Sequence, residues 1–418
     1  MYFALQLLSL CGLIVMAFYA HRGIFYAYTI LRRPGSLAPV DEFRRYGVLI
    51  SARNEEKVIA GLIRSLLEQD YPDGLVSVFV VADNCTDNTA EAARAAGATV
   101  FVRHNLNDIG KGYALHWLFQ KLRCSGLDAG VDAWIFFDAD NIVERSYIRQ
   151  INRAFVGGAQ IITSCRASKN FDDNWLSAGY SCGFLHDALF LNYPKSRLGL
   201  SAAVSGTGFL VADSVIRHFG GWPFHSLTED IEFTCAAVLA GYRVSYCHDA
   251  VFYDEQPTSF AESWRQRLRW AKGTMQVGQR YFLPLLRKAI RERSLIALEM
   301  ISMIFPIVLV MAFSYLIYVL MALVAAFSPT VTWHDVLAPL INNLTGAYLS
   351  MILMGAVSTA IGWKRIHAHP VIKLASIITF PLYMLSYIPI NTAALFTEVH
   401  WTPVSHSVTK DLDAIRGS

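Results

Sequence analysis

Long runs of apolar residues at both ends of the chain constrain its fold more than any other feature. The first covers residues 2–31, and three more lie at 294–327, 337–363 and 371–396. An α-helix rises about 1.5 Å per residue, so about 20 apolar residues cross the hydrocarbon core of a bilayer. Each run is long enough for one crossing. The pattern predicts a multi-pass membrane protein with a soluble portion between the first run and the others.

The composition agrees with this interpretation and excludes other classes. Hydrophobic residues make up 54% of the chain and charged residues 17%, whereas soluble proteins carry about 25% charged residues. A net charge of +3 is too small to indicate a nucleic-acid-binding protein. The seven cysteines include no C-x-x-C pair, which argues against a disulfide framework and against a structural zinc site.

The apolar runs divide the chain into five regions. A signal peptide begins with basic residues and has a shorter core, but here Arg32 and Arg33 follow the first run, so we expect an uncleaved membrane helix over 1–33. The second run contains Glu299 and exceeds one crossing. We therefore expect a soluble domain over 34–280, an interfacial amphipathic region over 281–304, membrane helices over 305–396 and a tail over 397–418.

Basic residues flank the runs on one side and predict the orientation. The first 20 residues and the loop 328–337 contain no Lys or Arg. The basic residues near the other ends of the runs are Arg32, Arg33, Arg44, Arg45, Arg280, Arg287, Lys288, Arg291, Arg293, Lys364 and Arg365. By the positive-inside rule, residues 34–280 face the cytoplasm.

Short apolar segments alternate with helix-like segments in residues 34–280. The expected strands are 47–50, 77–81, 134–137 and 161–164, and the expected helices include 57–69 and 87–96. Alternation of this kind predicts an α/β domain with a largely parallel sheet covered by helices.

Carboxylates follow two of these strands, at the edge where α/β domains bind ligands. Asp83 comes after 78–82, and Asp138 and Asp140 come after 134–137. Two carboxylates at i and i+2 of an extended segment lie on one face, where they can bind a divalent cation and, through it, a diphosphate. The alternative for such a D-x-D is a solvated turn.

Two further segments carry polar groups suited to chemistry. Thr228-Glu229-Asp230 precedes a helix-like segment, and its alternative role is helix capping with favourable dipole charges. The segment 266–270, Gln-Arg-Leu-Arg-Trp, offers Arg269 for a diphosphate and Trp270 as a surface for a sugar ring. The alternative for that segment is a basic amphipathic helix on the membrane surface.

Seven segments stand in a fixed order between residues 47 and 275: 50–56, 81–87, 110–115, 138–140, 205–208, 228–230 and 266–270. In this order they resemble the motifs of membrane-embedded family-2 glycosyltransferases, the group that includes cellulose, chitin and hyaluronan synthases. The resemblance implies a GT-A fold, a Rossmann-like nucleotide-sugar-binding domain flanked by transmembrane α-helices. It also implies a nucleotide-sugar donor, most often a UDP-sugar, with Mg²⁺ or Mn²⁺, in a multi-pass protein of the bacterial inner membrane.

The resemblance also implies roles for individual residues. Glu55 and Asp83 would contact the base and ribose, Lys111 and Asp138 would help to hold the nucleotide, and Asp140 would bind the metal. Asp230 would be the general base. The other residues expected to bind substrates are Ala52, Gly206, Thr207, Glu229, Gln266, Arg269 and Trp270. The family often has Asp where this chain has Ala82, and Tyr where it has Arg53, so the base of the nucleotide is less defined than the reaction.

These residues fit inverting glycosyl transfer, in which Asp230 removes a proton from the acceptor hydroxyl. The metal and Arg269 would stabilise the leaving diphosphate. We expect a processive polysaccharide synthase that elongates and translocates a polymer; the alternative is a transferase that adds one sugar to a membrane lipid. The expected partners are therefore the donor, a glycan or lipid acceptor and the bilayer. A transporter or non-catalytic scaffold is a third hypothesis, but only Glu299 and Lys373 place charge near the membrane runs.

The tail raises a question of topology. Residues 398–406 resemble the family's loop that closes over the nucleotide site, which requires a cytoplasmic tail. One N-terminal crossing and three complete later crossings would place the tail outside. Pro381 and Pro389 in the last run permit a kink or re-entry that would return it.

Overall fold

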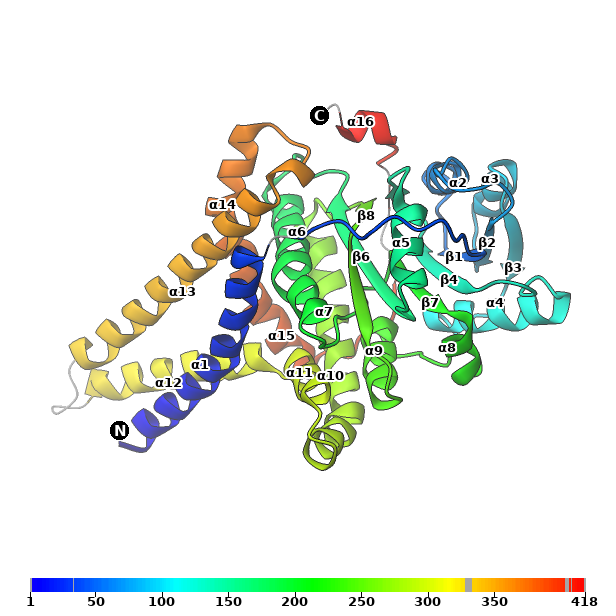
Figure 1. The fold of residues 1–418 in the computed structure, drawn as a ribbon. Helices are drawn as coiled ribbons and strands as arrows, with labels where there is room; N and C mark the ends of the chain where they lie inside the picture. The colour runs from blue at the N-terminus through cyan, green and yellow to red at the C-terminus, as the bar shows by residue number, and fades with distance from the viewer. Residues whose placement is uncertain (1, 33, 328–332, 403–405, 407, 417–418) are drawn as a thin grey trace.

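The computed structural model describes residues 2–32, 34–327, 333–402, 406 and 408–416. A sheet with helices on both faces occupies the right-hand half of Figure 1, and long helices extend from it to the left. The first helix, α1, lies among those long helices, beside segments that follow it by about 300 residues in the chain. The described chain therefore consists of an α/β domain joined to a bundle of apolar helices.

The sheet has eight strands in the order β3-β2-β1-β4-β7-β6-β8-β5. The strands are β1 (Tyr46–Ala52), β2 (Val76–Asp83), β3 (Thr99–Arg103), β4 (Ala133–Asp138), β5 (Ile142–Val143), β6 (Ile161–Ser168), β7 (Phe209–Ala212) and β8 (Val244–Asp254). Strands β3, β2, β1 and β4 are parallel, whereas β7 runs antiparallel to both β4 and β6. The prediction of a largely parallel sheet is therefore correct for one half, and the whole sheet is mixed, as in the GT-A fold.

Helices cover both faces, so successive strand residues enter different cores. Val48 and Ile50 of β1 pack into one core with α2, α3 and α5, and Leu49 between them packs into the other with α4, α8 and α9. This alternation follows from the two-residue period of a strand. The helices are α2 (Ile59–Leu67), α3 (Thr89–Ala95), α4 (Lys111–Ser125), α5 (Tyr147–Val156), α8 (Asp213–His218) and α9 (Glu229–Leu239).

Five helical segments connect the sheet to the apolar bundle: α6 (Trp175–His186), the π-helical η1 (Asp187–Asn192), α7 (Tyr193–Arg197), α10 (Phe260–Arg291) and α11 (Leu295–Ile304). The carboxylate of Glu299 in α11 is buried and lies 2.8 Å from Nζ of Lys195 in α7 and 3.3 Å from Nε2 of His21 in α1. Buried charges must be paired. This cluster therefore holds α1, α7 and α11 together.

The apolar helices are α1 (Tyr2–Leu31), α12 (Ile307–Phe327), α13 (Trp333–Ile361), α14 (Pro370–Leu385) and α15 (Tyr387–Phe396); η2 (Trp363–Arg365) and α16 (Leu412–Arg416) are short. Four segments of the described chain are long and apolar enough to cross a membrane: Gln6–Leu31, Ile307–Phe327, Leu337–Ile361 and Pro370–Phe396. Their positions agree with the four runs in the sequence. The run at 294–327 divides into α11 and α12 at Phe305 and Pro306, close to the expected boundary.

The last apolar run is broken into α14 and α15. Near its start, Nζ of Lys373 donates to the carbonyl of Trp363 (3.1 Å), and the adjacent Arg365 lies 3.8 Å from Asp249 of the sheet. Near its end, the carbonyl of Ala394 accepts from Nζ of Lys272 in α10 (3.0 Å). The start of the run therefore contacts η2, which reaches the sheet through Arg365, and the end of the run contacts α10. Both contacts agree with the predicted re-entry of this run.

Helix α6 approaches the apolar helix α14 closely at Gly179, and substitution of this glycine gives a test of the fold. A Cβ on Gly179 in α6 would lie 2.5 Å from Cγ of Tyr383 in α14. We expect Gly179→Ala to destabilise the protein by about 1–3 kcal/mol, because the two helices must separate. Gly346→Ala in α13 is the control, since no atom lies within 4 Å of its Cβ position, and Ala favours a helix over Gly by about 1 kcal/mol. Thermal unfolding in detergent would measure both; equal melting temperatures would contradict the prediction.

Candidate active site

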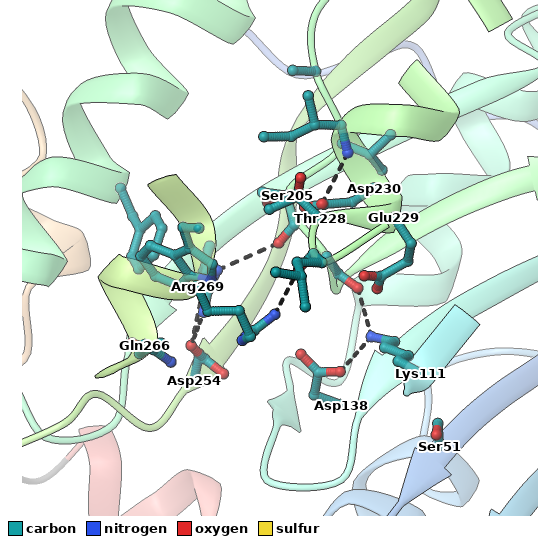
Figure 2. A pocket seen from close by; sticks show the side chains of 18 of the residues that line it. Ser51, Lys111, Asp138, Ser205, Thr228, Glu229, Asp230, Asp254, Gln266 and Arg269 are labelled. Atoms are coloured by element: carbon teal, nitrogen blue, oxygen red, sulfur yellow. Dashed lines mark hydrogen bonds and ion pairs between the residues drawn. The ribbon is translucent and has the colours of Figure 1, made fainter. Parts of the chain in front are cut away.

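A cavity of about 540 Å³ opens at the edge of the sheet where β1, β2 and β4 end. The carboxyl ends of parallel strands form the usual ligand site of α/β folds. Further lining comes from the loop before β7, the start of α9, one face of α10, the tail and the helices α6, η1, α7 and α11 that connect the sheet to the bundle. Figure 2 shows acidic and basic side chains from these elements pointing toward one another. The fold thus brings distant polar motifs into one place.

Two carboxylates lie at the end of the cavity formed by β1 and β2. Oδ1 of Asp83 accepts from Nη1 of Arg103 (2.5 Å) and from Nδ2 of Asn84 (3.1 Å). Burial raises the pKa of Asp83, and Arg103 opposes that rise. Oε1 of Glu55 contacts Nδ1 of His406 (2.9 Å), whereas Oε2 is buried without a hydrogen-bond partner in the described chain. Burial also raises the pKa of Glu55. A buried carboxylate oxygen without a partner at this position is suited to accept a hydrogen bond from a ligand.

The tail lies across this end of the cavity. The ring of Trp401 is 5.4 Å from the guanidinium carbon of Arg53, and the His406 ring contacts Glu55. Burial lowers the pKa of His406, but the negative charges of Asp140 and Glu55 outweigh it and raise that pKa to about 10. Residues 403–405 of the predicted loop lie outside the described residues. The described part of the tail is on the same side of the protein as the cavity.

Lys111 joins three walls of the cavity. It begins α4, and its ammonium donates to Asp138 at the end of β4 and to the carbonyl of Gly206 (2.7 Å) (Figure 2). Gly206 has φ +79°, which L-residues rarely adopt, and this turns its carbonyl toward Lys111. Burial lowers the pKa of Lys111, but the negative charges of Asp138, Glu229 and Asp230 together outweigh burial, so the net shift of the pKa is upward. The ammonium is therefore charged at neutral pH.

The D-x-D carboxylates differ in environment. The extended segment ends at Asp138, and Asp140 lies in the following turn, so the expectation of one extended face is wrong. The Asp138 side chain is 38% exposed. Asp140 is buried, and its Oδ2 accepts from the Glu255 amide (3.2 Å) and lies 4.0 Å from Nε2 of His406. Both line the cavity.

These residues fit a cation that binds together with a phosphorylated ligand. In the part of the chain that the structure describes, no three His, Cys, Asp or Glu side chains form a preassembled metal cluster. Mg²⁺ usually binds one or two carboxylates and completes its shell with substrate phosphates and water. Asp138 and Asp140 supply two such carboxylates, and the buried, unpaired Oε2 of Glu55 adds an oxygen nearby.

Glu229 and Asp230 begin α9 and face Lys111 and Arg269 (Figure 2). Thr228 occupies the N-cap position but makes no capping bond with its side chain, so the capping role is not observed. Burial and the neighbouring Asp230 raise the pKa of Glu229 to about 7. Burial also raises the pKa of Asp230, which Lys111 and Arg269 oppose. A carboxylate pair of this kind can hold or release a proton near neutral pH.

One face of α10 completes the cavity with Gln266, Arg269 and Trp270. Nη1 of Arg269 donates to the carbonyl of Leu227 (2.9 Å), and Oε1 of Gln266 is buried without a partner among the described residues. Arg267, on another face, is fully buried and donates to Oγ of Ser386 (2.6 Å). Both of these faces of α10 are therefore occupied by the protein itself, and location on the membrane surface stays a prediction for the rest of the helix.

Two of the residues expected to bind substrates do not line the cavity. Ala52 is buried in β1, where its carbonyl accepts from Sγ of Cys85 (3.5 Å). Thr207 is buried, and its Oγ1 accepts a hydrogen bond from the amide of Asp138 (2.9 Å). It therefore helps to fix the backbone of Asp138 and does not itself line the cavity. The other predicted residues line the cavity: Glu55, Asp83, Lys111, Asp138, Asp140, Gly206, Glu229, Asp230, Gln266, Arg269 and Trp270.

Sequence reasoning missed other lining residues. Arg166 in β6 and Asp254 at the end of β8 form a buried ion pair in the wall. Asp254 follows an apolar strand, as Asp83 and Asp138 do, and that signal could have identified it. Arg22 of α1 and Asp187 of η1 also line the cavity; no local pattern distinguishes them from basic and acidic residues at a membrane boundary.

Comparison with known sequences gives a consistent result. A family model described as "Glycosyltransferase like family 2" matches residues 44–273, which include the sheet and most of the cavity lining. A probable glycosyltransferase of Bacillus subtilis, YdaM, is 26% identical over 60% of this chain and 60% of its own length. The chain thus aligns with less than two thirds of that relative.

Two other relatives are named for different products, a glycolipid and a polysaccharide. The beta-monoglucosyldiacylglycerol synthase of a Nostoc species is 26% identical over 83% of this chain and 72% of its own length. The poly-beta-1,6-N-acetyl-D-glucosamine synthase of Staphylococcus aureus is 24% identical over 61% of this chain and 60% of its own length.

Among solved structures, a mannosyltransferase of Pyrobaculum calidifontis in complex with GDP-Man and Mn²⁺ has the same fold. Its TM-score is 0.59 at 16% identity, over 93% of this chain and 98% of that chain. The likeness therefore includes the apolar helices as well as the α/β domain.

Proposed function

Because the chain belongs to the glycosyltransferase-like family 2, we propose that it transfers a sugar, with inversion, from a nucleoside-diphosphate sugar to an acceptor hydroxyl at the membrane boundary. The observation that carries the proposal is the placement of Asp230 and Arg269 in the same cavity as the D-x-D carboxylates. The proposed base Asp230 and the cation Arg269 thus lie in the same cavity as the carboxylates that suit a nucleotide and a metal.

The donor occupies the end of the cavity at β1, β2 and β4. Glu55 and Asp83 accept hydrogen bonds from the base and ribose, and Lys111 holds Asp138 in place beside the diphosphate. Asp138 and Asp140 would hold Mg²⁺ or Mn²⁺, which when bound neutralises charge on the diphosphate. The mannosyltransferase complex with GDP-Man and Mn²⁺ supports a nucleotide sugar and a metal, and a UDP-sugar remains our proposed donor.

Transfer takes place at the other side of the donor. Asp230 removes the proton of the acceptor hydroxyl while that oxygen bonds to the anomeric carbon. The bond between the anomeric carbon and the diphosphate oxygen breaks, and a nucleoside diphosphate leaves with its electron pair. The guanidinium of Arg269 stabilises this developing charge. Gln266 and Trp270 position the acceptor, and no covalent intermediate is needed.

The acceptor class has two candidates. The Gln-x-x-Arg-Trp segment at 266–270 and the staphylococcal polymer synthase support the predicted processive polysaccharide synthase. The Nostoc relative, which aligns over more of this chain, supports transfer of one sugar to a membrane lipid. Both candidates use a nucleotide-sugar donor and Asp230 as the base, and they differ in the acceptor that enters the cavity beside Trp270.

We propose that the α/β domain faces the cytoplasm of a bacterial cell. The basic residues beside the apolar runs support this orientation through the positive-inside rule. The contacts of His406 with Glu55, and of both ends of the α14–α15 segment with the α/β side, support a tail on the same face. The domain limits predicted above remain our proposal.

Membranes containing the protein, a pool of labelled nucleotide sugars and Mn²⁺ provide the test. Labelled product in either high-mass polymer or lipid extract would support glycosyl transfer and decide between the acceptors. Absence of transfer and of donor hydrolysis with every sugar nucleotide would contradict the proposed function. Chelation by EDTA should abolish transfer, and Mn²⁺ should restore it.

The pKa of Glu229 leads to a prediction about pH dependence. As pH rises through about 7, Glu229 loses its proton and places a second negative charge beside Asp230, which becomes a stronger base. Lys111 faces the pair and stays charged across this range, because its pKa is raised. We expect kcat of the wild type to rise through a step near neutral pH, and Glu229→Gln to lack that step. Initial rates at saturating donor would show it, and an unchanged profile in the variant would contradict the assignment.

A further inference from the structure

A second cavity, of about 250 Å³, adjoins the first on its membrane side. It lies between α6–η1 on one side and α12, α13, α14 and α15 on the other. Phe184 and Asp187 line both cavities. The two spaces therefore lie on either side of this pair of residues, next to Trp270, whose ring centroid is 6.3 Å from that of Phe184.

The helices of the bundle contribute an apolar lining to this second cavity. Four methionines line it: Met311 of α12, Met351 and Met354 of α13, and Met384 of α14. Val308 and Ile388 add further hydrocarbon. Methionine is flexible and polarizable, so it adapts to flexible apolar ligands. The bundle therefore offers a ligand aliphatic and thioether groups together with the rings of Tyr383 and Tyr387.

The polar groups of the lining are already paired within the protein. The Tyr383 and Tyr387 hydroxyls lie 3.1 Å apart, and the Tyr180 hydroxyl lies 3.0 Å from Oγ of Ser263. His186 contacts Asp187 through Nδ1 (3.1 Å) and the Tyr26 hydroxyl through Nε2. A sugar chain in this space would bury hydroxyls that lack partners, which is costly. Hydrocarbon incurs no such cost.

The charges near the junction indicate a neutral headgroup. Lys195 lines the first cavity, but its ammonium is paired with Glu299 (2.8 Å). The side chain of Asp187 at the junction is 56% exposed and would repel an anion. A lipid phosphate at the junction would therefore meet the acidic Asp187. Of the cations that line the first cavity on this side, Lys195 and Arg166 are paired with carboxylates, and Arg22 also has an interaction within the protein.

We propose that the second cavity holds part of an acyl chain of a neutral membrane lipid, such as a diacylglycerol, whose free hydroxyl is the acceptor. The inference rests on the proposed function, because the hydroxyl must reach Asp230 and the donor in the first cavity. The lipid oxygen forms the new glycosidic bond, its proton passes to Asp230, and the nucleoside diphosphate leaves. The acceptor class is thereby the single-transfer lipid and not the polymer.

A pair of neighbouring substitutions in α13 tests this assignment. Met354→Trp fills the cavity, whereas Leu353→Trp is the control, because Leu353 is 64% exposed and lines neither cavity. The full chain would be reconstituted in phosphatidylcholine vesicles with long-chain or short-chain diacylglycerol. We expect Met354→Trp to lower kcat/KM for the long-chain acceptor by about tenfold, as when roughly two methylenes stay unburied. The short-chain acceptor and the Leu353→Trp protein should change little.

Several outcomes would overturn the proposal. They are equal losses for both chain lengths, equal losses in both variants, transfer to phosphatidylglycerol (an anionic lipid with free hydroxyls) in preference to diacylglycerol, or label in polymer alone. If transfer or donor hydrolysis persists in these cases, the proposed glycosyl transfer stands and only the lipid site is refuted. Loss of both transfer and donor hydrolysis in the wild type would instead refute the proposed function.

A second measurement does not depend on activity. A diacylglycerol with a photoreactive group in its acyl chain should crosslink to α13 and α14 residues of the second cavity in the Asp230→Asn protein. Met354→Trp should reduce that crosslinking and Leu353→Trp should not. Crosslinks confined to outward residues such as Leu353 would show that the chain remains in the bilayer, which contradicts the proposal.

Discussion

Asp230→Asn is expected to lower kcat by about 10²–10⁴-fold, the usual contribution of a general base, while the affinity for the donor stays near that of the wild type. The amide keeps the size of the carboxylate and its place at the start of α9, where Oδ1 of Asp230 accepts from the Ile231 amide (2.9 Å). It cannot accept the acceptor's proton. The donor groups on β1, β2 and β4 are unaffected by the change.

Two measurements on the same protein separate these effects. Titration calorimetry with the nucleotide sugar reports donor binding, and single-turnover transfer reports the chemical step. A loss of donor affinity as large as the loss of rate would show that Asp230 binds substrate and does not act as the base. Turnover close to the wild type would exclude the role altogether.

Removal of the Arg269 guanidinium should have the second largest effect. The Arg269 side chain is partly buried and lines the cavity beside Glu229 and Asp230. An electrostatic contact made with the developing charge of a leaving group is worth about 10²–10³ in kcat. Arg269→Ala should lose that factor, and Arg269→Lys should recover part of it because the charge remains but the bidentate geometry does not.

Arg265→Ala is the matched control for this substitution. Arg265 lies one turn earlier in α10, is exposed and does not line the cavity, so loss of its charge should leave kcat almost unchanged. Steady-state rates with saturating donor would compare the three variants. Similar losses for Arg265→Ala and Arg269→Ala would indicate a long-range charge effect on membrane or donor binding and would remove Arg269 from the leaving-group role.

The sequence was informative wherever one local pattern determined both structure and position. Apolar strands followed at once by Asp83 or Asp138 predicted strands and cavity-lining carboxylates together, since the end of a parallel strand is also the edge of the sheet. The apolar runs predicted α1, α12 and α13 within a few residues because the length needed to cross a bilayer is set by its thickness.

Features that depend on distant partners could not be predicted in this way. The four residues of β7 are all buried and show no alternation, so their antiparallel pairing with β4 and β6 is set by tertiary contacts. Arg166 interrupts a buried strand and would be read as solvent-exposed, but it pairs with Asp254, 88 residues later. The second cavity likewise exists only where four separate helical segments meet α6.

The cluster of His21, Lys195 and Glu299 has a consequence for biosynthesis. The cavity includes Arg22 from α1, Met303 from α11 and Trp401 from the tail, so its wall contains segments that precede and segments that follow the sheet in the chain. Glu299 cannot reach Lys195 and His21 until α11 has emerged. A nascent chain that has completed the sheet therefore has the donor groups but an open site. The wall of the cavity is therefore complete only after α11 and the tail have folded against the sheet.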